Sequence, residues 1–247
     1  TFGEALAKCI FLTGRLRAIW SDQEKVGILV PPSVGGALLN WAALLMGKIP
    51  VNLNYTLSQA GITSCIEQCG ITDVVVSGKL MKRLKLKLPV QVHLLEELQR
   101  KPSLVEKLRT GLLEKCTSAS GLLTLLGGSQ ANPDDLATII FSSESTGQPK
   151  GVMLSHDNIV SNVFAASKRL PLIHGESTAL SFLPVCHIYE RVLLYIYLFN
   201  GIRVSFAETI ENIGQNLNEK KPDVMSAVPR LLEKMYDSII SKGSDLT

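Results

Sequence analysis

The sequence has little net charge and few cysteines, and both shortages exclude classes of protein. Its 25 basic and 22 acidic residues leave a formal net charge of only +3 over 247 residues, which argues against nucleic acid as a partner. The five cysteines contain no CxxC pair. Because Cys65 and Cys69, the closest two, lack the spacing of a zinc knuckle, we expect no metal site and no disulfide framework. We expect reduced thiols in a cytoplasmic protein.

Segments that would direct the chain to a membrane or anchor it there are also lacking. The first ten residues carry Glu4 and Lys8 and have no sustained apolar core, unlike a signal peptide. Residues 26–47 hold no charge over 22 positions, enough to cross a bilayer. However, Pro31 and Pro32 interrupt this stretch and its first half is β-branched, so it predicts a strand, a turn and a buried helix.

Apolar residues are abundant, at 46% of the chain against 19% charged, so the chain can bury one large α/β domain or two small ones. Short apolar runs alternate with helical patterns. The predicted strands are 26–30, 49–53, 73–77, 136–142, 179–183, 203–207 and 223–228. The predicted helices are 33–46, 58–69, 156–168, 188–199, 210–219 and 230–240. This alternation predicts an α/β fold of layered, mostly parallel sheets with helices on both faces, and ligands bind where such strands end.

Residues 96–135 interrupt this alternation. They contain basic helical turns, the apolar run GLLTLLGG and the polar sequence ANPDD. We interpret them as the connection between two βα halves, which cover 1–130 and 131–247.

Residues 79–87 form a basic cluster, KLMKRLKLK, with five cations in nine positions. A solvated helix face explains such a cluster best. The leucines at 80, 84, 86 and 88 leave open a peripheral surface for anionic lipid or for an acidic carrier protein.

The chemistry is concentrated in the loop after the strand at 136–142. This loop is rich in hydroxyl groups, with a glycine that lets the main chain approach a ligand and a lysine that adds a positive charge. The residues concerned are Ser142, Ser143, Ser145, Thr146, Gly147 and Lys150. They suit the oxygens of a polyphosphate, and a Ser/Thr-rich surface turn has the same composition. A P-loop is excluded, because GxxxxGK followed by Ser or Thr is missing and an apolar run comes next.

The order of residues in 142–158, SSESTGQPKGVMLSHDN, resembles the signature of the acyl-adenylate-forming, or AMP-binding, superfamily. The resemblance implies that the six loop residues hold the β- and γ-phosphates while ATP activates a carboxylate. Glu144 departs from the signature, which usually has glycine there. A carboxylate about 4 Å from a phosphate charge costs roughly 4 kcal/mol at an effective dielectric near 20. Either Glu144 points to solvent or the loop holds ATP poorly.

Two further segments narrow the resemblance to long-chain acyl-CoA synthetases. SFLPVCHIYERV at 181–192 is similar to their LP-x-x-H-x-x-ER segment, and SAVPRLLEKMY at 226–236 is similar to a segment that borders their acyl tunnel. The resemblance implies an acyl and adenylate pocket. Its residues would be His187, Glu190, Arg191, Val228, Pro229 and Arg230. From residue type alone, one histidine after a strand is more often structural than catalytic.

The implied function is that of an ATP-dependent fatty-acid ligase, with ATP and Mg²⁺ as cofactors and a fatty acid as substrate. LLMGKIPVNLNY at 44–55 is closest to acyl–acyl-carrier-protein synthetases, so the acceptor thiol, CoA or a carrier protein, stays open. The alternatives are a fatty acyl-AMP ligase and a degenerate module that binds without catalysis. The Tyr-Gly-x-Thr-Glu loop, the Mg²⁺ ligand and the lid lysine of the family are expected downstream. We therefore expect an incomplete N-terminal large domain that is inactive by itself.

Overall fold

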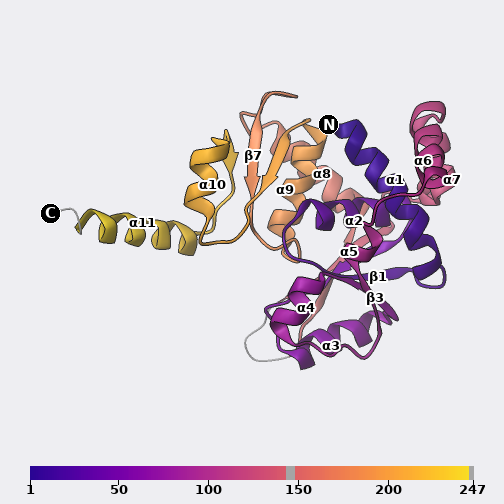
Figure 1. The fold of residues 1–247 in the computed structure, drawn as a ribbon, viewed down its shortest axis with the longest axis horizontal. Coiled ribbons are helices and arrows are strands. Elements are labelled where there is room, and N and C mark those ends of the chain that lie inside the picture. Colours follow the sequence, from indigo (N-terminus) through magenta and orange to yellow (C-terminus); the bar gives the residue numbers. More distant parts are fainter. Residues whose placement is uncertain (143–147, 245–247) are drawn as a thin grey trace.

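The computed structural model describes residues 1–142 and 148–244, and it confirms the predicted α/β class with mostly parallel sheets (Figure 1). In these ranges the strands form a six-stranded and a three-stranded sheet. No helix in the described part of the chain is both long enough and apolar enough to cross a membrane.

The larger sheet has the order β4-β3-β1-β2-β5-β6. Its strands are β1 (Lys25–Leu29), β2 (Ile49–Asn52), β3 (Asp73–Val76), β4 (Gln91–Leu94), β5 (Leu136–Phe141) and β6 (Gly151–Ser155). All pairs are parallel except β5 and β6, which form an antiparallel hairpin with Phe141 opposite Gly151. The sequence did not predict β4 or β6, because both lie at the edges of the sheet, where several of their residues are exposed.

The smaller sheet is entirely parallel and has the order β8-β7-β9. Its strands are β7 (Thr178–Ser181), β8 (Arg203–Phe206) and β9 (Val224–Met225). β8 and β9 lie inside predicted strands, and β7 begins one residue before the strand predicted at 179–183. The proposed division at 130/131 stays a prediction: the larger sheet takes strands from both sides of that point.

Helices connect the strands. They are α1 (Phe2–Ile19), α2 (Val34–Leu45), α3 (Gln59–Cys69), α4 (Gly78–Leu84), α5 (Leu95–Leu98), α6 (Leu104–Cys116), α7 (Ala119–Leu126), the 3-10 helix η1 (Gly128–Gln130), α8 (His156–Ser167), α9 (Ile188–Phe199), α10 (Ile213–Lys220) and α11 (Pro229–Ser244). Six of them match the predicted helices, whereas α1 was missed. It begins at a capping box, in which Thr1 and Glu4 bond to each other's backbone, and it buries Cys9, Leu12 and Leu16.

The larger sheet is covered on both faces, which explains its continuously apolar strands. In β3, Val74 and Val76 pack in a cluster with α3 and α4, while Val75 packs on the other side with α1 and α2. Successive strand residues point to opposite faces, so each face needs its own apolar set. A third cluster, from α8, α9, Ala37 of α2 and Ala137 of β5, connects the two sheets.

A buried pair of carboxamides fixes α2 to the end of β2. Asn40 Nδ2 donates to Asn52 Oδ1 at 3.1 Å, and Asn52 Nδ2 donates to Asn40 Oδ1 at 2.8 Å. Asn40 also donates to the carbonyl of Gly36 at 2.8 Å. Both side chains are buried, so either amide alone would be left with an unpaired polar group.

We expect Asn52→Ala to lower the free energy of unfolding by about 1–3 kcal/mol, because it leaves the Asn40 carboxamide buried and partly unpaired. Urea titration of the variants checks this. The double variant Asn40→Ala/Asn52→Ala should cost clearly less than the sum of the single changes. Additive effects would contradict the coupling of the two amides.

Candidate functional site

The carboxyl ends of the strands in both sheets open onto one cleft of about 510 Å³. Pro31 and Pro32 follow β1, and Tyr55 follows β2. Phe182 and Ala207 directly follow β7 and β8. The cleft therefore lies where parallel α/β sheets bind their ligands, as the strand pattern predicted.

Charged groups of both signs line this cleft. Arg83 comes from α4 and Arg230 from the first turn of α11, and Glu208 and Glu211 come from the segment after β8. Burial raises the pKa of the Tyr55 hydroxyl to about 12, with a further contribution from the nearby Cys186. Tyr55 is therefore a hydrogen-bond donor in the cleft at neutral pH.

The candidate phosphate loop connects β5 to β6. The Ser142 amide donates to the Lys150 carbonyl at 3.0 Å and closes the hairpin. The last residues of the loop are bonded to α3. Gln68 donates to the carbonyl of Pro149 at 3.0 Å, and the Ser64 hydroxyl donates to Gln148 at 3.3 Å. A strand follows the loop, so its geometry differs from a P-loop, in which a helix follows.

Only part of this loop lies in the described residues. Ser143, Ser145, Thr146 and Gly147, together with Glu144, lie outside them. Ser142 is described, and its Oγ is buried without a hydrogen-bond partner in the described part of the chain. A buried hydroxyl that has no protein partner at the start of a loop can donate a hydrogen bond to a ligand oxygen. Ser142 therefore fits a bound phosphate.

Glu190 lies inside the protein and links α9 to the smaller sheet. The Ser181 hydroxyl, at the end of β7, donates to Glu190 Oε1 at 2.5 Å, and the Ser226 hydroxyl donates to Oε2 at 3.4 Å. Burial raises the pKa of Glu190 to about 7, although both serine hydrogen bonds act in the opposite direction. The carboxyl group is thus satisfied by protein partners.

Arg191 is also buried, but its guanidinium is not satisfied. The side chain is 1% exposed, and its Nε donates to the Tyr195 hydroxyl at 3.0 Å. Both terminal nitrogens lack a hydrogen-bond partner, and no carboxylate pairs with Arg191 among the described residues. A buried charge without a partner costs several kcal/mol, so this position is suited to an anion supplied from outside the chain.

The other predicted pocket residues are distributed unevenly. Val228 and Arg230 line the cleft, and Pro229 is the first residue of α11. His187 is the exposed N-cap residue of α9, and its side chain makes no capping hydrogen bond. Tyr55 and Arg83 were missed as cleft residues. The positions of Tyr55 after β2 and of the basic cluster after β3 carried the signal, because both follow the ends of parallel strands.

Comparison with known proteins decides the family. The model of the AMP-binding enzyme family matches residues 1–246. The chain belongs to the AMP-binding enzyme family. Over 45% of its length it is 36% identical to long-chain-fatty-acid–CoA ligase 1 of Cavia porcellus, of which it covers 17%. Over 98% of its length it is 26% identical to long-chain-fatty-acid–CoA ligase 1 of Schizosaccharomyces pombe, of which it covers 38%.

Solved structures show the same fold. The N-terminal domain of FACL13 from Mycobacterium tuberculosis superposes with a TM-score of 0.75 at 18% identity, over 95% of this chain and 57% of that one. o-Succinylbenzoate coenzyme A synthetase from Bacillus subtilis, in complex with ATP and a magnesium ion, has a TM-score of 0.73 at 20% identity, over 96% of this chain and 46% of that one. The chain therefore spans less than two thirds of the length of these relatives. Among its described residues, no three His, Cys, Asp or Glu side chains gather as metal ligands.

The raised pKa of Glu190 predicts a pH-dependent stability. The folded state holds the proton up to about pH 7, whereas the unfolded state releases it near pH 4.5. The wild type should therefore lose stability as the pH rises through this window, by on the order of 3 kcal/mol relative to Glu190→Gln, which cannot ionise. Urea unfolding at several pH values checks this. The exposed variant Glu233→Gln should show no such difference. A constant gap between wild type and Glu190→Gln would contradict the assignment.

Proposed function

We propose that this chain provides the ATP-phosphate loop and the acyl pocket of an ATP-dependent fatty-acid ligase that transfers the acyl group to the thiol of CoA. Membership of the AMP-binding family and the two relatives named long-chain-fatty-acid–CoA ligases support the proposal. The observation that carries it is the buried guanidinium of Arg191, whose two terminal nitrogens have no partner among the described residues. Arg191 lies in the segment whose sequence resembles the acyl pocket of those ligases.

The reaction would have two steps. A carboxylate oxygen of the fatty acid attacks the α-phosphorus of ATP, so that a new P–O bond forms and the bond to pyrophosphate breaks. The thiolate sulfur of CoA then attacks the acyl carbon, and AMP leaves with the bonding electrons. Bound Mg²⁺ would neutralise phosphate charge in the first step.

The chain's own residues would bind and orient the reactants. Ser142, whose buried Oγ has no partner among the described residues, and Lys150 would bind phosphate oxygens at the two ends of the hairpin loop. Between them, the proposed ligands are Ser143, Ser145, Thr146 and Gly147. Preset donors of this kind stabilise charge that develops in the transition state.

The acyl side of the site is proposed from the second segment. Arg191 would hold an anionic group of the substrate or of the adenylate. His187, exposed at the start of α9, would border the entrance for the fatty acid, and Val228, Pro229 and Arg230 would form part of the wall. Glu190 would act by positioning α9, because its carboxyl group bonds to Ser181 and Ser226.

Two alternatives are retained. A carrier protein could replace CoA as acceptor, motivated by the sequence at 44–55, and acyl transfer assays with each thiol distinguish the two. A module that binds without catalysis is motivated by Glu144. Calorimetry with ATP and with palmitate separates the enzyme, which binds ATP, from a module that binds fatty acid alone.

In the intact protein, we expect Lys150→Ala to slow ATP–pyrophosphate exchange about 10- to 100-fold, because a charge-assisted bond to phosphate contributes on the order of 1.5–3 kcal/mol. Lys220→Ala, at an exposed lysine in α10, should leave the exchange rate unchanged. Wild-type exchange rates in the Lys150 variant would count against the phosphate role of the loop.

Arg191→Met should separate a functional from a structural role. Because no ion pair is lost, we expect the free energy of unfolding to stay the same or to rise by about 1 kcal/mol. Exchange should nevertheless fall at least about tenfold, with a raised KM for the substrate whose anion Arg191 holds. Arg203→Met is the control at an exposed arginine. A variant that unfolds more easily but keeps its KM values would show that Arg191 is structural.

A further inference from the structure

Helix α6 presents its apolar side to solvent. Its residues Leu104, Val105, Leu108 and Leu112 are 77%, 75%, 63% and 61% exposed, and no residue of the helix is buried. At about 100° per residue, these four positions lie within an arc of roughly 100°. A helix that packs on a globular core turns such a face inward. In α6 the orientation is reversed.

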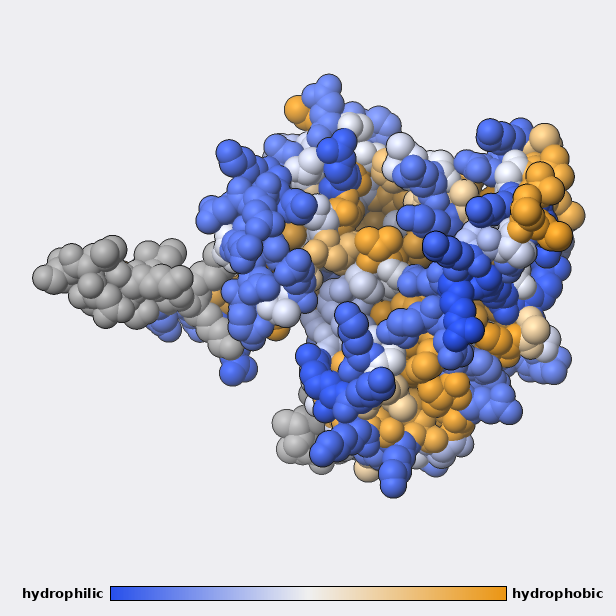
Figure 2. Space-filling model, in the orientation of Figure 1, coloured by the Kyte–Doolittle hydropathy of each residue, from blue (hydrophilic) through white to orange (hydrophobic). Residues whose placement is uncertain are grey.

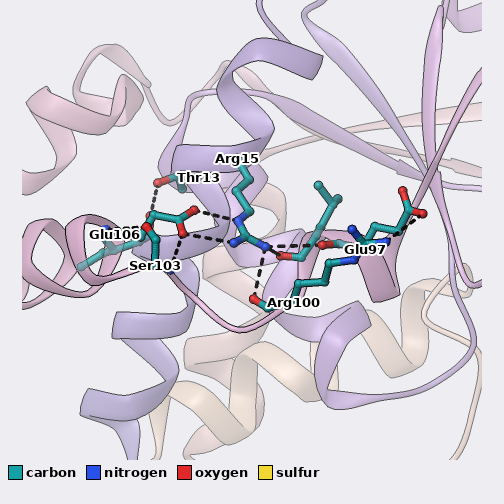
Figure 3. A network of polar contacts seen from close by, with 8 residues as sticks. Thr13, Arg15, Glu97, Arg100, Ser103 and Glu106 are labelled. Atoms are coloured by element: carbon teal, nitrogen blue, oxygen red, sulfur yellow. Dashed lines mark hydrogen bonds and ion pairs between the residues drawn. The ribbon is translucent and has the colours of Figure 1, made fainter.

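Polar contacts hold α6 in this orientation (Figure 3). Arg15 of α1 donates two hydrogen bonds to the Glu106 carboxylate, from Nε to Oε1 at 2.9 Å and from Nη2 to Oε2 at 3.2 Å. Its remaining nitrogen donates to the carbonyls of Leu98 and Arg100 at 2.9 and 3.2 Å. The same Glu106 closes the capping box with Ser103. Because Glu106 fixes one side of the first turn of α6 to α1, the leucines on the other side point away from α1.

Helix α7 extends this surface. Leu122 and Leu126 pack against Ile10 of α1, and Leu113 of α6 joins them. The carbonyl of Leu125 accepts from Arg17 Nη2 at 2.9 Å. The outward side chains of α7 are Leu123 and Leu125, 36% and 54% exposed. Figure 2 shows apolar residues gathered where Figure 1 places α6 and α7. We call these six side chains the α6–α7 apolar surface: Leu104, Val105, Leu108, Leu112, Leu123 and Leu125.

Basic residues accompany this surface. Between residues 100 and 126 there are five lysines and arginines and two glutamates. One of the glutamates, Glu106, is neutralised by Arg15. Lys101, Arg109 and Lys115 are exposed, and α7 carries no charge. Leucines flanked by cations fit the boundary between acyl chains and anionic headgroups, where apolar side chains insert and cations meet phosphates.

The basic cluster at 79–87 does not offer the same combination. Leu80 is buried, and Leu84, Leu86 and Leu88 pack against the core of the larger sheet. Its leucines therefore pack against the core, and its cations lie on the surface. That cluster can attract anions, but it has little apolar area to insert into a bilayer.

We propose that the α6–α7 apolar surface docks the protein on the surface of an anionic lipid bilayer. The axis of α6 lies in the plane of the membrane, the leucines reach below the phosphates, and Lys101, Arg109 and Lys115 contact the headgroups. The binding is peripheral and reversible, and it does not depend on ATP or on the ligase reaction. Its failure would therefore leave the proposed function untouched.

Cys116, at the end of α6, provides a reporter for this docking. It is exposed, whereas Cys9, Cys65, Cys69 and Cys186 are buried. An environment-sensitive dye on Cys116 of the intact protein should shift to the blue when vesicles of phosphatidylcholine with about 30% phosphatidylserine are added, and the shift should shrink as salt is raised. Pure phosphatidylcholine should give a much smaller shift.

Vesicle cosedimentation of variants tests which residues carry the binding. Leu104→Ser/Leu108→Ser should weaken binding to the anionic vesicles at least about tenfold, because two apolar side chains no longer leave water. The matched control Val160→Ser/Ile173→Ser removes two exposed apolar side chains elsewhere and should bind like the wild type. Arg109→Gln/Lys115→Gln should weaken binding, and Lys79→Gln/Lys82→Gln in the basic cluster should not.

Four results would overturn the proposal. The leucine variant could bind as tightly as the wild type, or the basic-cluster variant could lose binding instead. The lipid-free protein could also hide Cys116 from the dye, or form a dimer that the leucine variant abolishes. In that last case the surface is covered by protein and not by lipid. Circular dichroism confirms that each variant is folded.

Discussion

The packing of α8 and α9 between the two sheets is the constraint on which the rest of the site depends. Leu193 and Leu194 of α9 and Ile159 of α8 share one apolar cluster with Ala37 of α2 and Ala137 of β5. The small alanines allow the elements of the larger sheet to approach this joint closely. The carboxyl ends of β1, β2, β7 and β8 consequently open onto the same cleft. Neither sheet alone would enclose it.

Two consecutive buried residues of α9 show how structural and functional demands differ. Glu190 is satisfied by hydroxyl groups from β7 and from the segment after β9, so it stabilises the joint. Within the described part of the chain, the Arg191 side chain makes one hydrogen bond, to Tyr195, and its two terminal nitrogens have no partner. Burying an unpaired cation lowers the stability of the fold. A ligand anion would offset that cost, so Arg191 is where binding energy is available.

The sequence predicted the strands of both sheets because continuous apolar runs are typical of strands buried on two faces. It missed β4 and β6, whose edge positions leave residues such as Val92 and Met153 exposed. The loop at 142–150 was found from its motif. Arg191 was identified by resemblance. The sequence did not show that its terminal nitrogens lack hydrogen-bond partners among the described residues, because that depends on which distant segments pack around it. The same holds for Glu190, whose partner Ser226 lies 36 residues away.

The two basic, leucine-rich segments show where pattern reasoning stops. Both 79–87 and α6 combine leucines with cations. The pattern favoured a solvated helix face for 79–87 and left a lipid surface open only there. In the folded chain the leucines of 79–87 complete the core cluster under α3 and α4, whereas those of α6 remain outside. The difference comes from Arg15, which is 91 residues from Glu106 in sequence and turns the acidic side of α6 toward α1. An amphipathic sequence shows that a helix has an apolar face. In α6, the ion pair between Arg15 and Glu106 determines whether that face packs on the core or faces solvent.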